Sequence, residues 1–445
     1  MPRRVALVHM PGWPLGEERF LLPGNMLFAA GLLQAADMDV RVLDYSHPEA
    51  LTRPAAAWQA LRAETTWWKR RQASRDFDRI LNEWRDAIIE DIVAWGADTI
   101  LFFADDAPSG KQVRHAADTA RKRLPHVQLF ACGPGMPMTG TPWIPWQASD
   151  FLVSQEAPLA KFGDMDLAEI DLPASLYDSG KFNILPVAPA RSGFHGSWDT
   201  PAFRGQLTGH LTRHRPGTAI WLEEPTTPRE LFELSDRTVL RHPAPIAMVA
   251  RPRAGISPAL ANLLRGSGCL VIEIDALTGS QRLLEDVYGV DFSVRDIRDL
   301  ARTCREAGIR VVLRFSAPCC WDDRHTFAEC ERLAEQCGCV GVSVAGAESH
   351  DSPVGIPGVP SPVDLERHLE AAGIPTGLRG WHIVAATAAG YAGREHRWIR
   401  QFRQHLLEGD LESVKSWITT CNRGLSHLSS ATASAATSRL HAVAN

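Results

Sequence analysis

Polar side chains that can carry chemistry stand at or near the expected ends of several strands in the second half of the chain. They are Glu224, Arg251, Asp275, Ser280 and Arg314. The planar guanidinium groups of Arg251 and Arg314 suit a carboxylate, which each can bind through two parallel hydrogen bonds. Ion pairs inside the protein would use the same residue types. The pattern therefore indicates either a site for a carboxylate-bearing ligand or a structural network of charges.

The loop at residues 191–201 has the sequence RSGFHGSWDTP. His195 is the one side chain in it that ordinarily titrates near neutral pH, so it is a candidate general base; otherwise it is an exposed loop residue. Asp199 in the same loop and Glu224 at the end of the next strand complete the candidate catalytic set. We predict no metal ion bound directly by these side chains.

The first half of the chain carries a second group of candidates, in the loops that follow its expected strands. Asp105 and Asp106 end the third strand, where they either contact a cofactor or form a solvated pair. Glycines at a strand end let the backbone approach a flat, bulky cofactor, although any tight turn needs them too. The candidate cofactor-binding residues of this half are Trp13, Pro14, Asp105, Asp106, Gly133, Pro134, Gly135 and Glu156.

The nine cysteines do not form a disulfide scaffold in a chain of 445 residues. Cys330, Cys337 and Cys339 lie on an expected helix or at the start of the next strand, and we expect them to pack in the core. Cys319 and Cys320 follow the fifth strand of the second half at its carboxyl end. They either contact a ligand there or are ordinary loop residues.

Strand and helix patterns alternate through the first half of the chain. Continuous apolar runs predict buried strands, and apolar stripes predict the helices between them. The predicted strands are residues 4–10, 39–44, 98–103, 127–132 and 150–153, and the predicted helices are residues 25–36, 51–95 and 110–123. This α/β order predicts a doubly wound, Rossmann-like parallel sheet over residues 1–160, with ligands at the carboxyl ends of its strands.

A second series follows a linker at residues 161–182. Its predicted strands are residues 183–188, 218–222, 246–250, 269–274, 310–315 and 340–344, and its clearest helices are residues 258–266, 294–307 and 324–336. Six strand–helix units in order predict a partial barrel of the TIM type over residues 183–350. A mainly helical region is expected at residues 351–425, and residues 426–445, rich in Ser, Ala and Thr, predict a flexible tail.

The bulk composition excludes several functional classes. A chain of 445 residues suits two or three domains, and 45% hydrophobic with 22% charged residues is ordinary for a globular protein. The formal net charge of −5 is small, so we expect no nucleic-acid partner. No stretch has the length of a membrane span, and the apolar run near the start is too short for a signal peptide. We therefore expect a cytoplasmic protein.

The order of several fragments resembles the B12-binding domain of cobalamin-binding proteins in the radical-SAM superfamily. Residues 23–33 (PGNMLFAAGLL) and 40–44 (VRVLD) are similar to its first helix and second strand. Gly133-Pro134-Gly135 resembles the turn at the corrin's nucleotide tail, and Glu156 stands where such proteins have a Gly-Glu-Gly-Glu stretch. The DxHxxG motif, whose histidine binds cobalt in some relatives, is absent; Trp13 stands in that loop and would shield the lower face of a corrin.

The second half resembles the barrel of the same superfamily. The matching fragments are residues 220–225 (IWLEEP), 249–253 (VARPR), 256–260 (ISPAL), 273–275 (EID), 279–281 (GSQ) and 307–309 (AGI). In that superfamily such strand ends hold the amino, carboxylate and ribose groups of S-adenosylmethionine. The resemblance therefore implies contacts between this cofactor and Arg251, Asp275, Ser280 and Arg314.

The resemblance breaks at the first barrel strand. There the superfamily has a CxxxCxxC loop, whose thiolates bind three irons of a [4Fe–4S] cluster and leave the fourth open to S-adenosylmethionine. In this chain no cysteine occurs between Cys132 and Cys269, and Phe194, Trp198 and Pro201 occupy the three ligand positions. None of these side chains binds iron. We predict that the cluster is absent.

Our leading hypothesis is an enzyme of bacterial specialised metabolism that binds cobalamin and works by polar chemistry, such as methyl or alkyl transfer on a small molecule. S-adenosylmethionine is the second candidate cofactor. Two alternatives stay open. One is a non-catalytic partner of an active radical-SAM relative. The other is a radical-SAM enzyme with a non-standard cluster site at Cys319 and Cys320.

Overall fold

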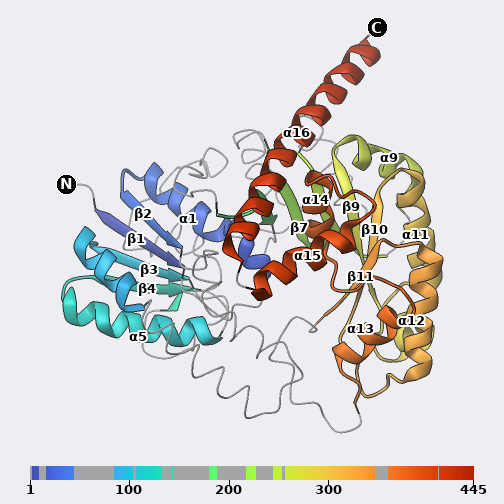
Figure 1. Cartoon of the computed structure of the whole chain (residues 1–445), viewed down its shortest axis with the longest axis horizontal. Helices are drawn as coiled ribbons and strands as arrows, with labels where there is room; N and C mark the ends of the chain where they lie inside the picture. Colours follow the sequence, from blue (N-terminus) through green and yellow to red (C-terminus); the bar gives the residue numbers. More distant parts are fainter. Residues whose placement is uncertain are drawn as a thin grey trace. The chain divides into compact units, whose positions relative to one another are not determined.

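The computed structural model of the chain describes residues 3–9, 17–44, 85–103, 107–132, 143–144, 180–187, 217–226, 244–252, 256–345, 359–408 and 410–444. The chain divides into two compact units, each with one parallel sheet (Figure 1). The N-terminal unit comprises residues 1–182, 187–215 and 403–418, and the barrel unit comprises residues 183–186, 216–402 and 419–445. None of the described helices is long and apolar enough to cross a membrane.

The N-terminal unit contains a five-stranded parallel sheet in the order β2-β1-β3-β4-β5. Its strands are β1 (Arg4–His9), β2 (Asp39–Asp44), β3 (Thr99–Phe103), β4 (Gln128–Cys132) and β5 (Trp143–Ile144). The order reverses between β1 and β3, and sheets of this kind bind ligands at the carboxyl ends beside the reversal. The predicted parallel α/β sheet is confirmed. The strand predicted at residues 150–153 lies outside the described residues.

Helices pack against the apolar central strands of this sheet. Ala6 and Val8 of β1 pack in one buried cluster with residues of α5 (Ala107–Arg123) and of the helical segment 85–95. α1 (Gly24–Ala35) packs against β1 and β2, and a short 3-10 helix, η1 (Glu17–Phe20), precedes it. The helices predicted at residues 25–36 and 110–123 are therefore confirmed. Of the helix predicted at residues 51–95, only residues 85–95 are described, and they are helical.

The barrel unit contains a six-stranded sheet in sequential order, which forms a half-barrel. Its strands are β6 (Ile184–Val187), β7 (Ala219–Thr226), β8 (Ile246–Ala250), β9 (Cys269–Leu277), β10 (Arg310–Phe315) and β11 (Gly341–Val344). The recorded pairings from β7 to β11 are all parallel. All six predicted barrel strands are confirmed. Each could be predicted because it is an apolar run between helix and turn signals.

Helices α9 (Pro258–Gly266), α11 (Val294–Glu306) and α12 (Arg324–Cys337) connect the strands on the outer side of the half-barrel (Figure 1), and the short α10 (Gln281–Asp286) follows β9. Helices α9, α11 and α12 each begin at a side chain that accepts hydrogen bonds from the first turn: Ser257, Ser293 and Asp323, respectively. α12 ends at Gly338 in the left-handed conformation, which favours glycine.

The segment after β11 turns back over the half-barrel. α13 (Pro362–Ala371) packs on α12, and the backbone of Pro375 and Leu378 then hydrogen-bonds to Val342 of the edge strand. α14 (Gly380–Ala388) follows on the side of the sheet away from α9, α11 and α12 (Figure 1). Its residues 380–386 are all buried, and it contacts β7, β8 and β9. α14 therefore fills part of the concave side of the half-barrel.

The chain ends in α15 (Glu395–Glu408) and α16 (Leu411–Ala444). α16 continues through residues 426–444, where the sequence predicts a flexible tail. Alanine, which recurs in this segment, is the best helix former. Four apolar residues at helical spacing are also buried: Val414, Ile418, Cys421 and Leu425. The start of the segment thus continues a packed helix.

Candidate functional site

Three rows of side chains cross the concave face of the half-barrel. Residues in register on parallel neighbours share a face, and alternate residues along a strand return to it. The lower row is Trp221, Ala247 and Val271, the middle row is Val249, Glu273 and Val312, and the upper row is Arg251, Asp275, Arg314 and Ser343. The upper row is nearest the carboxyl ends of the strands, where barrels of this kind bind their ligands.

In the upper row, Asp275 stands between two arginines. Arg314 is its register partner on β10, and Arg251 directly follows Ala250, whose register partner is Ile274. Burial raises the pKa of Asp275; the charges of Arg314 and Arg251 lower that pKa, Glu273 raises it, and the net result is a raised pKa. Within the described part of the chain, no hydrogen bond or ion pair engages the three side chains. The charges of the three side chains thus alternate across neighbouring strands at the carboxyl edge of the sheet.

The middle row contains a fully buried carboxylate that the sequence analysis did not single out. Glu273 Oε1 accepts hydrogen bonds from Trp221 Nε1 at 3.0 Å and from the backbone N–H of Gly380 at 2.6 Å. Arg379 Nε lies 3.4 Å from Glu273 Oε2, and its guanidinium stands 5.0 Å from the centre of the Trp221 ring. These contacts attach the start of α14 to β7 and β9 directly below the upper row.

A glycine is required where α14 meets this carboxylate. A side chain at Gly380 would stand 2.9 Å from Glu273 Oε1 and 3.1 Å from the Ala247 side chain. The other end of α14 is held at the amino end of β10, where Arg310 bonds to Thr387 and to Glu395. α14 therefore runs from the middle row toward the amino ends of the strands, and the upper row lies beyond its first residue.

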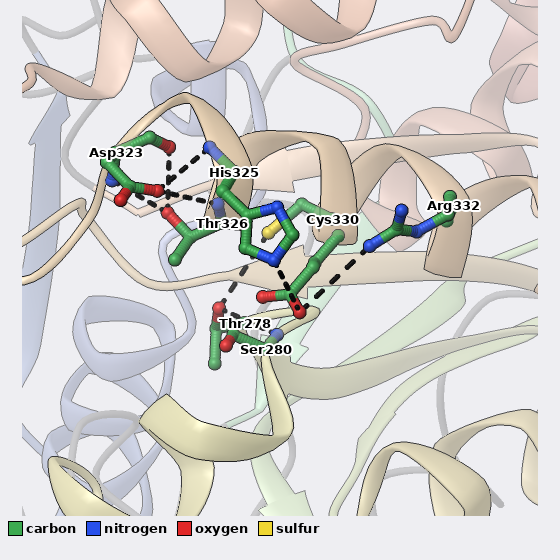
Figure 2. Close-up of polar contacts among 8 residues, drawn as sticks. Thr278, Ser280, Asp323, His325, Thr326, Cys330 and Arg332 are labelled. Atoms are coloured by element: carbon green, nitrogen blue, oxygen red, sulfur yellow. Dashed lines mark hydrogen bonds and ion pairs between the residues drawn. The ribbon is translucent and has the colours of Figure 1, made fainter.

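The loop after β9 is attached to α12 (Figure 2). Gly279 N–H donates to Cys330 Sγ at 3.2 Å, and Thr278 Oγ1 lies 3.8 Å from the same sulfur. A side chain at Gly279 would meet the backbone of α12 at 2.4 Å, so only glycine fits this approach. Ser280, a predicted cofactor contact, is buried in this loop beside Thr278, whose Oγ1 accepts its N–H at 3.2 Å.

The remaining polar groups in Figure 2 come from the start and the outer side of α12, apart from Thr326, which is buried. Asp323 caps the helix by accepting the N–H groups of His325 and Thr326. Glu329 lies 3.6 Å from His325 Nε2 and 4.0 Å from Arg332. Because the His325 and Arg332 side chains are exposed, these pairs contribute little to stability and form no site.

Of the three cysteines predicted to pack in the core, Cys330 and Cys337 do so, and Cys339 does so only in part. Cys330 and Cys337 are buried, and burial raises the pKa of each thiol to about 12. Cys339 is partly covered, and its thiol pKa is raised to about 11. Cys320 is exposed, and the neighbouring Cys319 is partly buried. Among the described residues, no group of three or more His, Cys, Asp or Glu side chains could hold a metal ion.

A second polar cluster, also missed by the sequence analysis, lies at the carboxyl ends of β1 and β2 in the N-terminal unit. His9 and Asp44 are register partners, and His9 Nδ1 lies 3.1 Å from Asp44 Oδ1. Lys181 Nζ lies 2.6 Å from Asp44 Oδ2. Burial alone would raise the pKa of Asp44, but Lys181 and His9 outweigh it and hold that pKa well below its usual range.

Many predicted site residues lie outside the described part of the chain. They are Trp13, Pro14, Asp105, Asp106, Gly133, Pro134, Gly135, Glu156, His195 and Asp199. Glu224 lies in β7 at a register irregularity between Leu222 and Thr226, and its side chain is not described. Of the predicted site residues whose side chains the structure describes, Arg251, Asp275 and Arg314 come together in the upper row, and Ser280 lies in the loop after β9.

Comparison with solved structures finds distant likenesses in fold. One is a radical S-adenosylmethionine methyltransferase, TsrM from Kitasatospora setae, with tryptophan and a SAM analogue bound: 12% identity, TM-score 0.47, covering 77% of this chain and 72% of that one. The same enzyme with cobalamin and a [4Fe–4S] cluster gives 13% identity, TM-score 0.46 and coverages of 77% and 75%. The cobalamin-dependent S-adenosylmethionine radical enzyme OxsB gives 11% identity and a TM-score of 0.45, and the match covers 75% of this chain and 51% of that one.

At identities of 11–13%, these structures are similar to this chain in fold alone. No protein-family model matches the sequence, and no curated protein matches it. The functional argument therefore rests on this chain's own residues.

Proposed function

We propose that the protein is an enzyme that binds cobalamin and S-adenosylmethionine and transfers a methyl or alkyl group to a small molecule by polar chemistry, without a [4Fe–4S] cluster. Cobalamin supplies a cobalt nucleophile for such transfer. The chain's own residues would bind and orient the amino-acid end of S-adenosylmethionine.

The observation that carries the proposal is the upper row. Two arginines flank one carboxylate on three neighbouring strands, at the edge of the half-barrel where ligands bind. Arg251 and Arg314 offer planar donors to a carboxylate, and Asp275 offers an acceptor to an ammonium group. A ligand with both groups on one carbon, an α-amino acid, matches this alternation of charge. S-adenosylmethionine carries that group.

The N-terminal unit supports the cobalamin part of the proposal through its topology. Candidate cofactor residues follow β3, which stands beside the reversal in strand order, and its neighbour β4: Asp105 and Asp106 lie two and three residues after β3, and Gly133 comes directly after β4. Doubly wound sheets use these loops for cofactors. The buried His9–Asp44 pair adds a fixed imidazole at the same edge of the sheet.

The absence of a cluster rests on the sequence at residues 191–201, which has no cysteine. Cys319 and Cys320 are adjacent, and the nearest other cysteine, Cys330, is held in the core by Gly279 and Thr278. Two thiolates are fewer than the three that the superfamily's clusters use. We therefore propose polar chemistry instead of reductive cleavage of S-adenosylmethionine.

The first test is an ultraviolet–visible spectrum with cobalt and iron analysis of protein produced anaerobically with cobalamin. We expect a corrin spectrum, about one cobalt per chain and no stoichiometric iron. A colourless protein without cobalamin affinity would refute the cofactor assignment. A stoichiometric iron–sulfur cluster would refute the polar mechanism.

The second test is calorimetric binding of S-adenosylmethionine to the upper-row variants. Loss of a hydrogen bond to a charged group costs about 1.5–3 kcal/mol, so Arg314→Lys and Asp275→Asn should each weaken binding by roughly 10- to 100-fold. Arg295→Lys, whose side chain is 82% exposed on α11, is the matched control and should bind like the wild type. Equal affinities for all variants would show that the ligand does not use this row.

A further inference from the structure

The fourth member of the upper row is a buried serine whose hydroxyl has no hydrogen-bond partner. Ser343, in β11, is 5% exposed. In the described part of the chain, its Oγ makes no hydrogen bond. A hydroxyl removed from water without a compensating hydrogen bond is costly, so an unpaired one in a native protein calls for an explanation.

The register places this hydroxyl beside the two charges discussed above. Ser343 pairs with Arg314 on β10, and Arg314 pairs with Asp275 on β9. Val342 and Val344, its neighbours along the strand, point to the opposite face because side chains alternate. The order across the upper row is therefore carboxylate, guanidinium, hydroxyl.

The groups beside Ser343 limit which ligand group can form a hydrogen bond with its hydroxyl. A guanidinium has donors and no acceptor, and a hydroxyl can both donate and accept. Strands in a sheet stand about 4.8 Å apart, so one planar oxyanion can accept from both side chains at once. Asp275, on the other side of Arg314, is a pure acceptor when ionised and suits the neighbouring ammonium.

We propose that Ser343 is a ligand-binding residue, which donates its hydroxyl hydrogen bond to the α-carboxylate of the bound amino-acid moiety together with Arg314, while Asp275 accepts from its α-ammonium group. The inference rests on the proposed function, because S-adenosylmethionine supplies that moiety. It adds a specificity determinant: the hydroxyl strengthens the binding of ligands that carry the carboxylate over that of ligands without it.

A second buried hydroxyl provides the matched control. Thr99 Oγ1 is also buried, and it also lacks a hydrogen-bond partner among the described residues. Thr99 is the first residue of β3, at the amino end of its strand, whereas Ser343 stands near the carboxyl end of β11. Parallel sheets bind ligands at the carboxyl ends of their strands. Thr99→Val therefore removes the same kind of group at the amino end of a strand, where no ligand is expected.

The experiment uses the full chain and two probes, S-adenosylhomocysteine and 5′-methylthioadenosine, which share the nucleoside but differ in the amino-acid group. Affinities are measured by calorimetry for the wild type, Ser343→Ala and Thr99→Val, and thermal melting is recorded for each. We expect Ser343→Ala to bind S-adenosylhomocysteine about 3- to 30-fold more weakly and 5′-methylthioadenosine unchanged. Its melting temperature should equal or exceed that of the wild type, because an unpaired buried hydroxyl is removed.

The outcomes separate this inference from the proposed function. Wild-type protein that binds neither probe overturns both. Wild-type protein that binds S-adenosylhomocysteine with the same affinity as Ser343→Ala overturns the inference alone. Equal weakening for both probes, or a marked fall in melting temperature, would make Ser343 a structural residue and also overturns it. Selective weakening for S-adenosylhomocysteine, with Thr99→Val unchanged, supports it.

Discussion

Replacing Lys181 with methionine should destabilise the N-terminal unit more than any exposed charge substitution. The Lys181 side chain is 2% exposed and that of Asp44 is 7% exposed, with 2.6 Å between Nζ and Oδ2. At an effective dielectric constant of about 20, charges at that separation attract by roughly 6 kcal/mol. Removing the lysine also removes the cost of burying its own charge. The net loss for breaking a buried pair is therefore about 3–5 kcal/mol.

Hydrogen exchange read on the β1 and β2 peptides is the direct assay, because these strands end at His9 and Asp44. A loss of 3–5 kcal/mol corresponds to exchange on the order of 10²- to 10³-fold faster. The double variant Lys181→Met with Asp44→Asn should recover most of the loss, since it leaves no unpaired buried charge. Glu90→Gln removes one partner of the exposed pair with Arg123 and should leave exchange unchanged.

Two results would refute this reasoning. If Lys181→Met accelerates exchange less than about fivefold, roughly 1 kcal/mol, the ion pair contributes no more than a surface pair. If the double variant is as unstable as the single one, lost packing of the lysine stem, and not the Asp44 charge left without its lysine, is the cause.

Three further predictions follow from the described contacts. The low pKa of Asp44 stabilises the folded state above the ordinary aspartate range, and this stability should disappear as the pH falls through the folded pKa; an acid titration of β1 and β2 exchange should flatten in Asp44→Asn. Gly279→Ala should destabilise the barrel unit in urea unfolding, because its side chain would meet the α12 backbone at 2.4 Å. In native protein, iodoacetamide should alkylate the exposed Cys320 and spare Cys330, whose thiol pKa is about 12, until denaturant is added; mass spectrometry locates the label.

The sequence predicts the strands and crossover helices well because local patterns determine them. Strands β2, β8 and β10 and helix α9 have the predicted bounds, since each is an apolar run or stripe that ends at a turn or capping signal. The helix at residues 426–444 was not predicted, because composition was weighed above helix propensity; the flexibility of this segment stays a prediction.

The site was predicted only in part, because no local sequence pattern determines the register between neighbouring strands. Arg251, Asp275 and Arg314 could be singled out as charges at strand ends, but their sharing of one row depends on how three strands align. Ser343 carries a detectable signal, a polar residue inside the apolar strand GVSV. The His9–Asp44–Lys181 cluster has none, because its members are separated by 35 and 137 residues.

The two carboxylates of β9 differ in their contacts, and the difference supports our proposal that a ligand binds at the upper row and not at the middle one. Glu273 and Asp275 lie on the same face two residues apart, yet Glu273 accepts hydrogen bonds from Trp221 and Gly380 and lies beside Arg379. Its charge is thus committed to holding α14 in place. Asp275 has opposite charges near it and, among the described residues, no hydrogen bond. An ammonium group bound at this row, as in the proposed function, would give this carboxylate a hydrogen bond that the described residues do not supply.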